Sequence, residues 1–327
     1  MVVVLVTSRS FSTGDLNLVA ELQAAGCTLR AGPSNHDLGR LRPLLADTRY
    51  WIAGTGPVTA AHFDAAPHLR LVARYGVGTE AVDLAAAAAR GVLVTNTPGA
   101  NTAAVADHAV ALMLAALRDI TAGDRSVRAG DWRVQQTRQL GELTVGVVGL
   151  GRIGREVVGR LKGFGSTLLG HDPFVHADQF TALSVTEVEL NELAQRSDVI
   201  TLHISGGKAL VDAPFLEQVK PTAILVNTAR GTLIDEAALA AALRAGRLHR
   251  YAADVLGSQT GSLDNPLLAD DLLDRTLFTP HAGAQTVEAV DRMGRSAVDA
   301  VLALVRAEEP PNLVPLVEPL CPFPGAQ

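Results

Sequence analysis

The chain has 327 residues, of which 48% are hydrophobic and 19% are charged, and it carries a formal net charge of −6 at neutral pH. This length predicts two domains, and the high apolar content excludes an intrinsically disordered chain. The negative charge and the lack of a basic cluster in the sequence argue against a nucleic-acid partner.

Three further features indicate a cytoplasmic protein. No apolar run in the sequence reaches the ~20 residues that a membrane span requires, so no membrane partner is expected. The apolar stretch Met1–Val6 lacks the length and the basic start of a signal peptide. The two cysteines, Cys27 and Cys321, belong to no CxxC or Cys/His pattern, which favours reduced thiols and no metal site.

Alternating strands and helices are predicted along the first hundred residues. Helices are expected at Leu16–Ala25 and after Asp83, whose carboxylate can cap the alanine-rich segment that follows. This alternation predicts a parallel sheet with helices on both faces. Short apolar runs indicate the strands Val2–Val6, Tyr50–Ala53, Leu69–Ala73 and Val92–Thr95.

A second unit begins with a long apolar helix, expected at Asn101–Ile120. A helix after Gly283 is predicted to return to the first unit. The chain is thus expected to hold two doubly wound α/β domains, residues 1–98 with 285–327 and residues 99–284. The strands expected in the second domain are Val145–Val148, Ser166–Asp172, Val199–Leu202, Ala223–Val226, Arg250–Ala253 and Thr276–Thr279.

The first strand of the second unit leads into the fingerprint of a dinucleotide site. Gly149, Gly151 and Gly154 permit a tight turn, close approach of a pyrophosphate and close packing of a helix on the strand. A helix over Arg152–Phe164 would direct its first N–H groups at that phosphate. Asp172, at the end of the next strand, can accept hydrogen bonds from ribose hydroxyls and would repel a 2′-phosphate, so NAD is predicted rather than NADP.

Polar residues follow most of the predicted strands of the second unit. Ligands bind at the carboxyl ends of parallel strands, so these residues are expected to line one edge of the sheet and to face the same cofactor. They are Asp172, His203, Asn227–Arg230, Asp254 and His281.

Arg230 and His281 indicate the chemistry at this edge. A guanidinium binds a carboxylate with a bidentate fork, and a histidine exchanges a proton near neutral pH. Together with NAD they predict hydride transfer at a carbon that bears a hydroxyl. A core or capping role is commoner for an arbitrary histidine, and an arginine could equally form a surface ion pair, so the argument depends on the shared edge.

Seven segments, spread over nearly the whole chain, carry motifs of one enzyme family. They are Tyr75–Asp83, Thr95–Thr102, Val105–His108, Gly149–Gly154, Val226–Gly231, Ala253–Val255 and Thr279–Gly283. The sequence resembles the NAD-dependent D-2-hydroxyacid dehydrogenases, most closely their phosphoglycerate dehydrogenase branch. The resemblance implies a Rossmann nucleotide domain inserted in a flavodoxin-like substrate domain, and a homodimer formed largely through the nucleotide domain.

The resemblance also implies a role for each matching residue. Arg230 would bind and polarise the substrate, and His281 would act as the acid/base. The backbone at Val77 and Gly78 would receive the substrate carboxylate, and Arg74 would help to bind a distal phosphate. NAD would contact the glycine turn with its pyrophosphate, Asp172 with its ribose and several residues with its nicotinamide. The cofactor-binding set is Gly149, Gly151, Arg152, Ile153, Gly154, Asp172, Thr97, His203, Thr228, Asp254 and Gly283.

Two departures from the family pattern are visible. Gln259, a third candidate catalytic residue, stands where the family has a glutamate that orients the histidine and raises the pKa of its imidazole. A neutral amide can still hold the ring, and Glu288, Asp264 or another subunit could supply a carboxylate. The segment His203–Lys208 is shorter than the family's usual loop, which changes the wall near the nicotinamide.

The leading hypothesis is an NAD-dependent oxidoreductase that acts on a small anionic substrate. It would transfer a hydride between nicotinamide and a 2-hydroxy acid or 2-keto acid, with or without a phosphate or phosphonate group. Gln259 leaves room for a non-catalytic NAD(H) sensor or corepressor-like scaffold, although retention of Arg230 and His281 argues against it. Oxidation of a small oxyanion such as phosphite is a third alternative, which Gln259 neither favours nor forbids.

Overall fold

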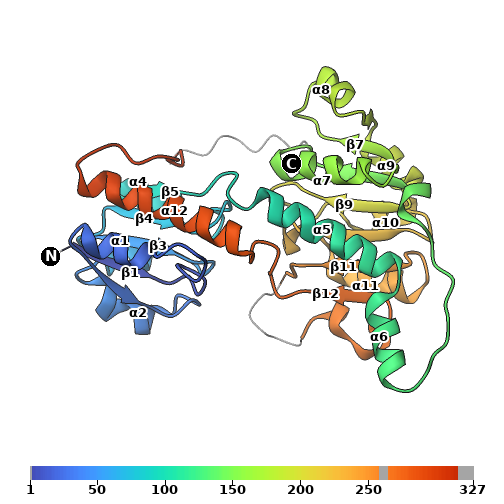
Figure 1. Ribbon diagram of the computed structural model, residues 1–327, viewed down its shortest axis with the longest axis horizontal. Helices are drawn as coiled ribbons and strands as arrows, with labels where there is room; N and C mark the ends of the chain where they lie inside the picture. The colour runs from blue at the N-terminus through green and yellow to red at the C-terminus, as the bar shows by residue number, and fades with distance from the viewer. Residues whose placement is uncertain (1, 258–263, 316–327) are drawn as a thin grey trace. The chain divides into compact units, whose positions relative to one another are not determined.

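The computed structural model describes residues 2–257 and 264–315 (Figure 1). The chain divides into two compact units, Met1–Asn101 with Ala284–Gln327 (unit 1) and Thr102–Gly283 (unit 2). Each unit is built on one parallel sheet, so the predicted α/β class is confirmed. Among the described helices, none combines the length and the apolar character that crossing a bilayer requires.

In the described ranges, unit 1 has five strands and five helices. The strands are β1 (Val2–Val6), β2 (Cys27–Ala31), β3 (Tyr50–Ala53), β4 (Leu71–Arg74) and β5 (Leu93–Thr95). The helices are α1 (Leu18–Ala24), α2 (Leu38–Leu45), α3 (Ala60–Asp64), α4 (Leu84–Ala89) and α12 (Val287–Val305). The spatial order β2-β1-β3-β4-β5 is the flavodoxin-like order, in which the winding direction reverses between β1 and β3.

Both faces of the unit 1 sheet are covered because successive strand residues point to opposite sides. Val4 and Ile52 pack in one cluster with α1 and α12, whereas Leu5 and Trp51 pack in another with α2, α3 and α4. A Cβ atom at Gly294 would lie 2.3 Å from the nearest side-chain atom of α1, so this glycine allows α12 to approach α1 closely.

Unit 2, as far as the structure describes it, has seven strands, seven helices and four short 3₁₀ helices. The strands are β6 (Thr144–Val148), β7 (Thr167–His171), β8 (Thr186–Glu187), β9 (Val199–Leu202), β10 (Ile224–Asn227), β11 (Arg250–Ala253) and β12 (Thr276–Phe278). The α-helices are α5 (Thr102–Leu117), α6 (Ile120–Arg128), α7 (Arg152–Lys162), α8 (Ala177–Ala182), α9 (Leu190–Arg196), α10 (Ala213–Gln218) and α11 (Glu236–Arg244). The 3₁₀ helices are η1 (Leu140–Glu142), η2 (Gly231–Leu233), η3 (Pro266–Leu268) and η4 (Asp270–Leu272).

The unit 2 sheet has the order β12-β11-β10-β9-β6-β7-β8, which is a Rossmann arrangement that reverses between β6 and β9. Val145 and Val147 pack with α5 and α7 on one face. Val148 and Ile200 pack with α9, α10 and α11 on the other face. The reversal point therefore lies where β6 ends, at the glycine turn.

Two of the local differences from the sequence-based expectation have a physical reason in the backbone or in burial. The long helix expected at Asn101–Ile120 is confirmed as α5, but its predicted end is wrong, because α5 ends at Leu117 and a separate helix, α6, begins at Ile120. Asp119, between them, has a φ angle of 57°, and a left-handed residue cannot continue a right-handed helix. Strand β2 was not predicted, since it is an edge strand with only one buried residue and no apolar run.

A buried polar network lies in unit 1 around His36. The Nε2 atom of His36 lies 2.7 Å from the hydroxyl of Thr7, which also accepts a hydrogen bond of 2.9 Å from the indole N–H of Trp51. His36 Nδ1 lies 3.1 Å from the carbonyl oxygen of Pro57, so Nδ1 must carry the proton and Nε2 must accept. Burial, reinforced by the nearby His62 and Arg74, lowers the pKa of His36 to about 4.

Acid should therefore destabilise unit 1 through His36. The unfolded chain takes up a proton near pH 6.5 and the folded chain only near pH 4, so the unfolding free energy falls by about 1.4 kcal/mol per pH unit between these values. His36→Asn tolerates the left-handed backbone of this position and does not titrate. Denaturant unfolding of both proteins from pH 4 to 8 should give a flatter pH dependence for the variant, and equal slopes would contradict this assignment.

Candidate active site

The glycine turn after β6 contains three glycines with different environments. Gly149 has a φ angle of 92°, and a Cβ there would lie 2.6 Å from Ile204 and 2.7 Å from the carbonyl oxygen of His203. A Cβ at Gly154 would lie 2.0 Å from the carbonyl oxygen of Gly149, so these two glycines are required by the packing of the protein itself. A Cβ at Gly151, by contrast, would meet no protein atom within 4 Å. Gly151 therefore borders open space at the start of α7, where a pyrophosphate would fit.

Asp172 braces this turn from the end of β7. Its two carboxylate oxygens accept hydrogen bonds from the backbone N–H groups of Leu150 (2.8 Å) and Phe174 (3.0 Å). Arg155, on α7, donates from Nε to the carbonyl oxygen of Leu150 at 2.7 Å and so holds the other side of the same residue. The Asp172 side chain is partly exposed, and a carboxylate has lone pairs for further donors such as ribose hydroxyls.

Two further residues predicted to bind the cofactor, His203 and Thr228, follow neighbouring strands of the sheet. His203 follows β9, and burial lowers the pKa of its imidazole to about 3, so the ring is neutral at physiological pH. Its Nε2 atom lies 2.9 Å from the hydroxyl of Thr201. The hydroxyl of Thr228, after β10, is buried and has no hydrogen-bond partner among the described residues. A buried unpaired hydroxyl is costly, and a polar ligand group would satisfy it, so the residues present fit a dinucleotide.

Arg230 is placed by the turn that follows β10. Asn227 is fully buried, and its side chain accepts a hydrogen bond from the Ala229 N–H (2.9 Å) and donates one to the Arg230 carbonyl oxygen (2.8 Å). The guanidinium of Arg230 donates to the carbonyl oxygen of Ala229 at 2.8 Å. The turn therefore fixes the backbone from which the guanidinium projects.

Asp254, after β11, anchors the segment that carries His281. Its buried carboxylate accepts hydrogen bonds from the hydroxyl of Thr279 (2.5 Å) and from the backbone N–H groups of Ala282 and Gly283 (2.8 Å each). The backbone N–H of His281 itself donates to the Asp254 carbonyl oxygen at 3.0 Å. His281 has a φ angle of 55°, in the left-handed region, so this segment needs such support.

The electrostatics of Asp254 follow from the same contacts. Burial opposes ionisation of the carboxyl, but hydrogen bonds from His108, Thr279, Gly283 and Ala282 together outweigh it and hold the pKa below its usual value. Asp254 is therefore charged at neutral pH. Sequence reasoning missed the contributions of His108 and Thr279, because nothing in their spacing places them on this carboxylate.

The predicted site residues divide between the two units. Asp172, His203, Thr228, Arg230, Asp254 and His281 all follow carboxyl ends of the unit 2 sheet. The candidates of unit 1 lie at the carboxyl ends of its strands: Arg74 is the last residue of β4, Val77 and Gly78 follow it, and Thr97 follows β5.

Within unit 1, Arg74 is mostly buried, and Asn96 donates to the Val77 carbonyl oxygen at 2.8 Å. The hydroxyl of Thr97 is buried without a hydrogen-bond partner in the described ranges. The prediction for Gln259 lies outside the described residues. Of the alternative carboxylates, Asp264 belongs to unit 2 and Glu288 to the first turn of α12 in unit 1.

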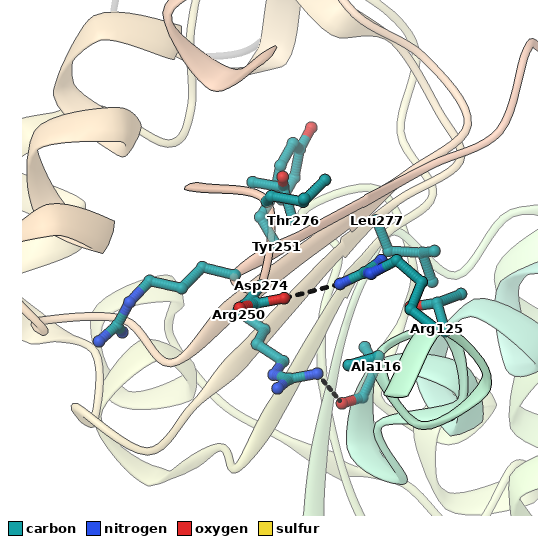
Figure 2. A pocket seen from close by; sticks show the side chains of 11 residues that line it. Ala116, Arg125, Arg250, Tyr251, Asp274, Thr276 and Leu277 are labelled. Carbon is teal, nitrogen blue, oxygen red and sulfur yellow. Dashed lines mark hydrogen bonds and ion pairs between the residues drawn. The ribbon is translucent and has the colours of Figure 1, made fainter. Parts of the chain in front are cut away.

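A small pocket in unit 2 lies away from these residues (Figure 2). Its lining includes Arg250 and Tyr251 at the start of β11, and Thr276 and Leu277 at the start of β12. These are the amino ends of the strands, at the opposite edge of the sheet from Asp254 and the other candidates. Figure 2 shows the ion pair between Arg125 and Asp274 across this region. The pocket therefore takes no part in the site described above.

The three glycines should respond differently to substitution. Gly151→Ala should leave the unfolding transition unchanged but weaken NADH binding by about tenfold or more, because its Cβ would enter only the open space. Gly149→Ala should lower stability as well, since its Cβ meets protein atoms. Thermal unfolding and NADH fluorescence titration measure the two effects. Unchanged NADH affinity in a well-folded Gly151→Ala protein would show that the pyrophosphate does not bind at this turn.

Comparison with known proteins identifies the family. Residues 110–283 match the model described as D-isomer specific 2-hydroxyacid dehydrogenase, NAD binding domain. A glyoxylate reductase from Korarchaeum cryptofilum is 39% identical over 269 residues, which are 80% of this chain and 80% of that protein. A D-3-phosphoglycerate dehydrogenase from Archaeoglobus fulgidus is also 39% identical over 269 residues, but these are 50% of its length, so this chain spans about half of that relative.

A solved structure extends the likeness to nearly the whole fold. The TT0316 protein from Thermus thermophilus has a TM-score of 0.86 and 33% sequence identity, covering 96% of this chain and all of that one. The matched residues 110–283 include the glycine turn and Asp172, His203, Thr228, Arg230, Asp254 and His281, and the predicted cofactor, NAD, is confirmed by this match. The chain therefore belongs to the D-2-hydroxyacid dehydrogenase family, near its phosphoglycerate dehydrogenases, with its NAD-binding domain in unit 2.

Proposed function

We propose that this protein interconverts a small 2-hydroxy acid and the corresponding 2-keto acid. The observation that carries the proposal is the placement of Arg230 and His281 at the carboxyl edge of the NAD-binding sheet, after β10 and β12, with Asp254 directly after β11, the strand between them. NAD, when bound, supplies the acceptor or donor of the hydride. The chain itself must then bind the acid and move one proton.

His281 performs the proton transfer in this proposal. During oxidation, its imidazole takes the proton of the substrate hydroxyl, and during reduction it returns a proton to the carbonyl oxygen. Arg230 binds the substrate carboxylate through its fixed guanidinium and polarises the adjacent carbonyl. Gln259 stays a prediction as the residue that orients the imidazole.

The substrate class includes acids with a second anionic group. Arg74 supports this extension, because it is a mostly buried guanidinium at the carboxyl end of β4, in the segment expected to receive the substrate. Relatives with similar identity are named D-3-phosphoglycerate dehydrogenase and glyoxylate reductase, and these names describe acids with and without a phosphate. Asp172, at the end of β7 and hydrogen-bonded to the glycine turn, supports a preference for NAD over NADP.

A second copy of this chain is the proposed partner. No residue of α6 is buried, and its apolar side chains include Ile120 (56% exposed) and Val127 (44% exposed). Trp132 and Val134, in the segment that follows, are 78% and 96% exposed. Large apolar side chains gathered in one short stretch are typical of a protein interface, and this stretch belongs to the NAD-binding unit.

Substitution of His281 tests the proposed activity. The wild-type protein should oxidise NADH with at least one member of a panel of 2-keto acids, including phosphate- and phosphonate-bearing ones. His281→Gln should lower kcat by about 10²- to 10⁴-fold, because the proton donor is lost, while NADH affinity changes little. Absorbance of the nicotinamide at saturating NADH measures the rate. Tight NADH binding by the wild type without turnover of any acid would instead favour a non-catalytic NAD(H) sensor.

Arg74 tests the substrate class separately. Arg74→Gln should lower kcat/KM about tenfold or more for acids with a second anionic group, because a charge-assisted contact is lost. The same variant should leave glyoxylate reduction within about twofold. Thermal unfolding of both proteins controls for the burial of this side chain. Equal losses for both kinds of acid would show that Arg74 does not select the second anion.

A further inference from the structure

A chain of hydrogen bonds leads from α5 to the segment that carries His281. The hydroxyl of Thr279 lies 2.5 Å from Asp254 Oδ1 and 2.8 Å from His108 Nε2. The hydroxyl has one proton, which it donates to the carboxylate, so it must accept from the imidazole. His108 Nε2 therefore carries a proton, and the same atom lies 3.3 Å from Asp254 Oδ1.

These hydrogen bonds support a segment whose backbone conformation is unfavourable by itself. The left-handed conformation of His281 costs about 1–3 kcal/mol unless the surroundings impose it. Asp254 imposes it from both sides, because Thr279 precedes His281 and the N–H donors Ala282 and Gly283 follow it. The backbone conformation of the His281 segment is thus tied to the position of one carboxylate.

His108 differs from the other donors to Asp254. Thr279, Ala282 and Gly283 belong to the segment being held, so they cannot by themselves fix the carboxylate relative to the rest of the unit. His108 comes from α5, a helix packed in the core of unit 2. The fit around it is close, since a Cβ at Gly283 would lie 3.0 Å from Asp254 Oδ2 and 3.5 Å from His108 Cδ2.

We propose that His108 is a positioning residue that fixes Asp254 and Thr279 and thereby holds His281 in its working orientation. The catalytic importance of this role rests on the proposed function of His281. The structural part does not, because the contacts that define it are all within unit 2. The proposal requires a hydrogen-bond donor at the Nε2 position of His108; it does not require the bulk of the imidazole ring.

The experiment compares two substitutions at His108 in the full-length protein. His108→Leu keeps apolar bulk but removes the donor, and His108→Gln can place an amide N–H near the lost Nε2 position. In His108→Leu, the amides of Ala282 and Gly283 should exchange hydrogen about tenfold faster, and kcat with a 2-keto acid should fall about tenfold with a smaller change in KM. His108→Gln should restore both to within about threefold of the wild type.

Substitutions of Thr279 test the same hydrogen bonds independently. Thr279→Val should reproduce the faster exchange and lower kcat, Thr279→Ser should not, and the double variant His108→Leu/Thr279→Val should lose little more than either single variant. Asp107→Asn is the matched control on α5, because Asp107 pairs with Arg160 and not with Asp254. It should leave exchange and kcat at the wild-type values.

The results separate the possible outcomes. Wild-type exchange in His108→Leu, or equal loss in His108→Gln and His108→Leu, would overturn the proposal and leave His108 a packing residue. If His108→Leu does not fold, the Thr279 pair decides the question in the same way. If the wild-type protein turns over no acid, the proposed function fails, but the exchange rates still show whether His108 orders the segment.

Discussion

The buried carboxylate of Asp254 is the interaction on which the carboxyl edge of unit 2 depends. Removing a charge from water is unfavourable unless hydrogen bonds replace the lost solvent. Here a hydroxyl, two backbone N–H groups and an imidazole replace it. The segment around His281 cannot relax without leaving this charge unsatisfied, so the cost of an unpaired anion stabilises a strained backbone.

The glycine turn follows the same physical logic on the other side of the strand-order reversal. The Asp172 carboxylate also accepts backbone N–H groups, and one of them belongs to Leu150 inside the turn. In both places a carboxylate at a strand end accepts backbone N–H groups of a neighbouring loop, and Asp254 accepts the Thr279 hydroxyl as well. Backbone donors do not change rotamer, so the loops that receive the dinucleotide and carry His281 are fixed before any ligand binds.

Sequence patterns revealed much of this arrangement but not its supports. Strands such as β9 and β11 are short apolar runs, and parallel pairing then places their following residues at one edge, so His203 and Asp254 could be assigned to it. The contact between His108 and Thr279 joins residues 171 positions apart. No periodicity encodes such a contact, and His108 is one of nine histidines in the sequence. The break at Asp119 was missed because its left-handed backbone leaves no pattern in an otherwise helical segment.

The donors around position 254 also explain why the residue there is an aspartate. Thr279, Ala282 and Gly283 all donate to its side chain, and Nε2 of His108 lies 3.3 Å from Oδ1. An asparagine would turn an NH₂ group toward at least one of these donors and leave both unsatisfied.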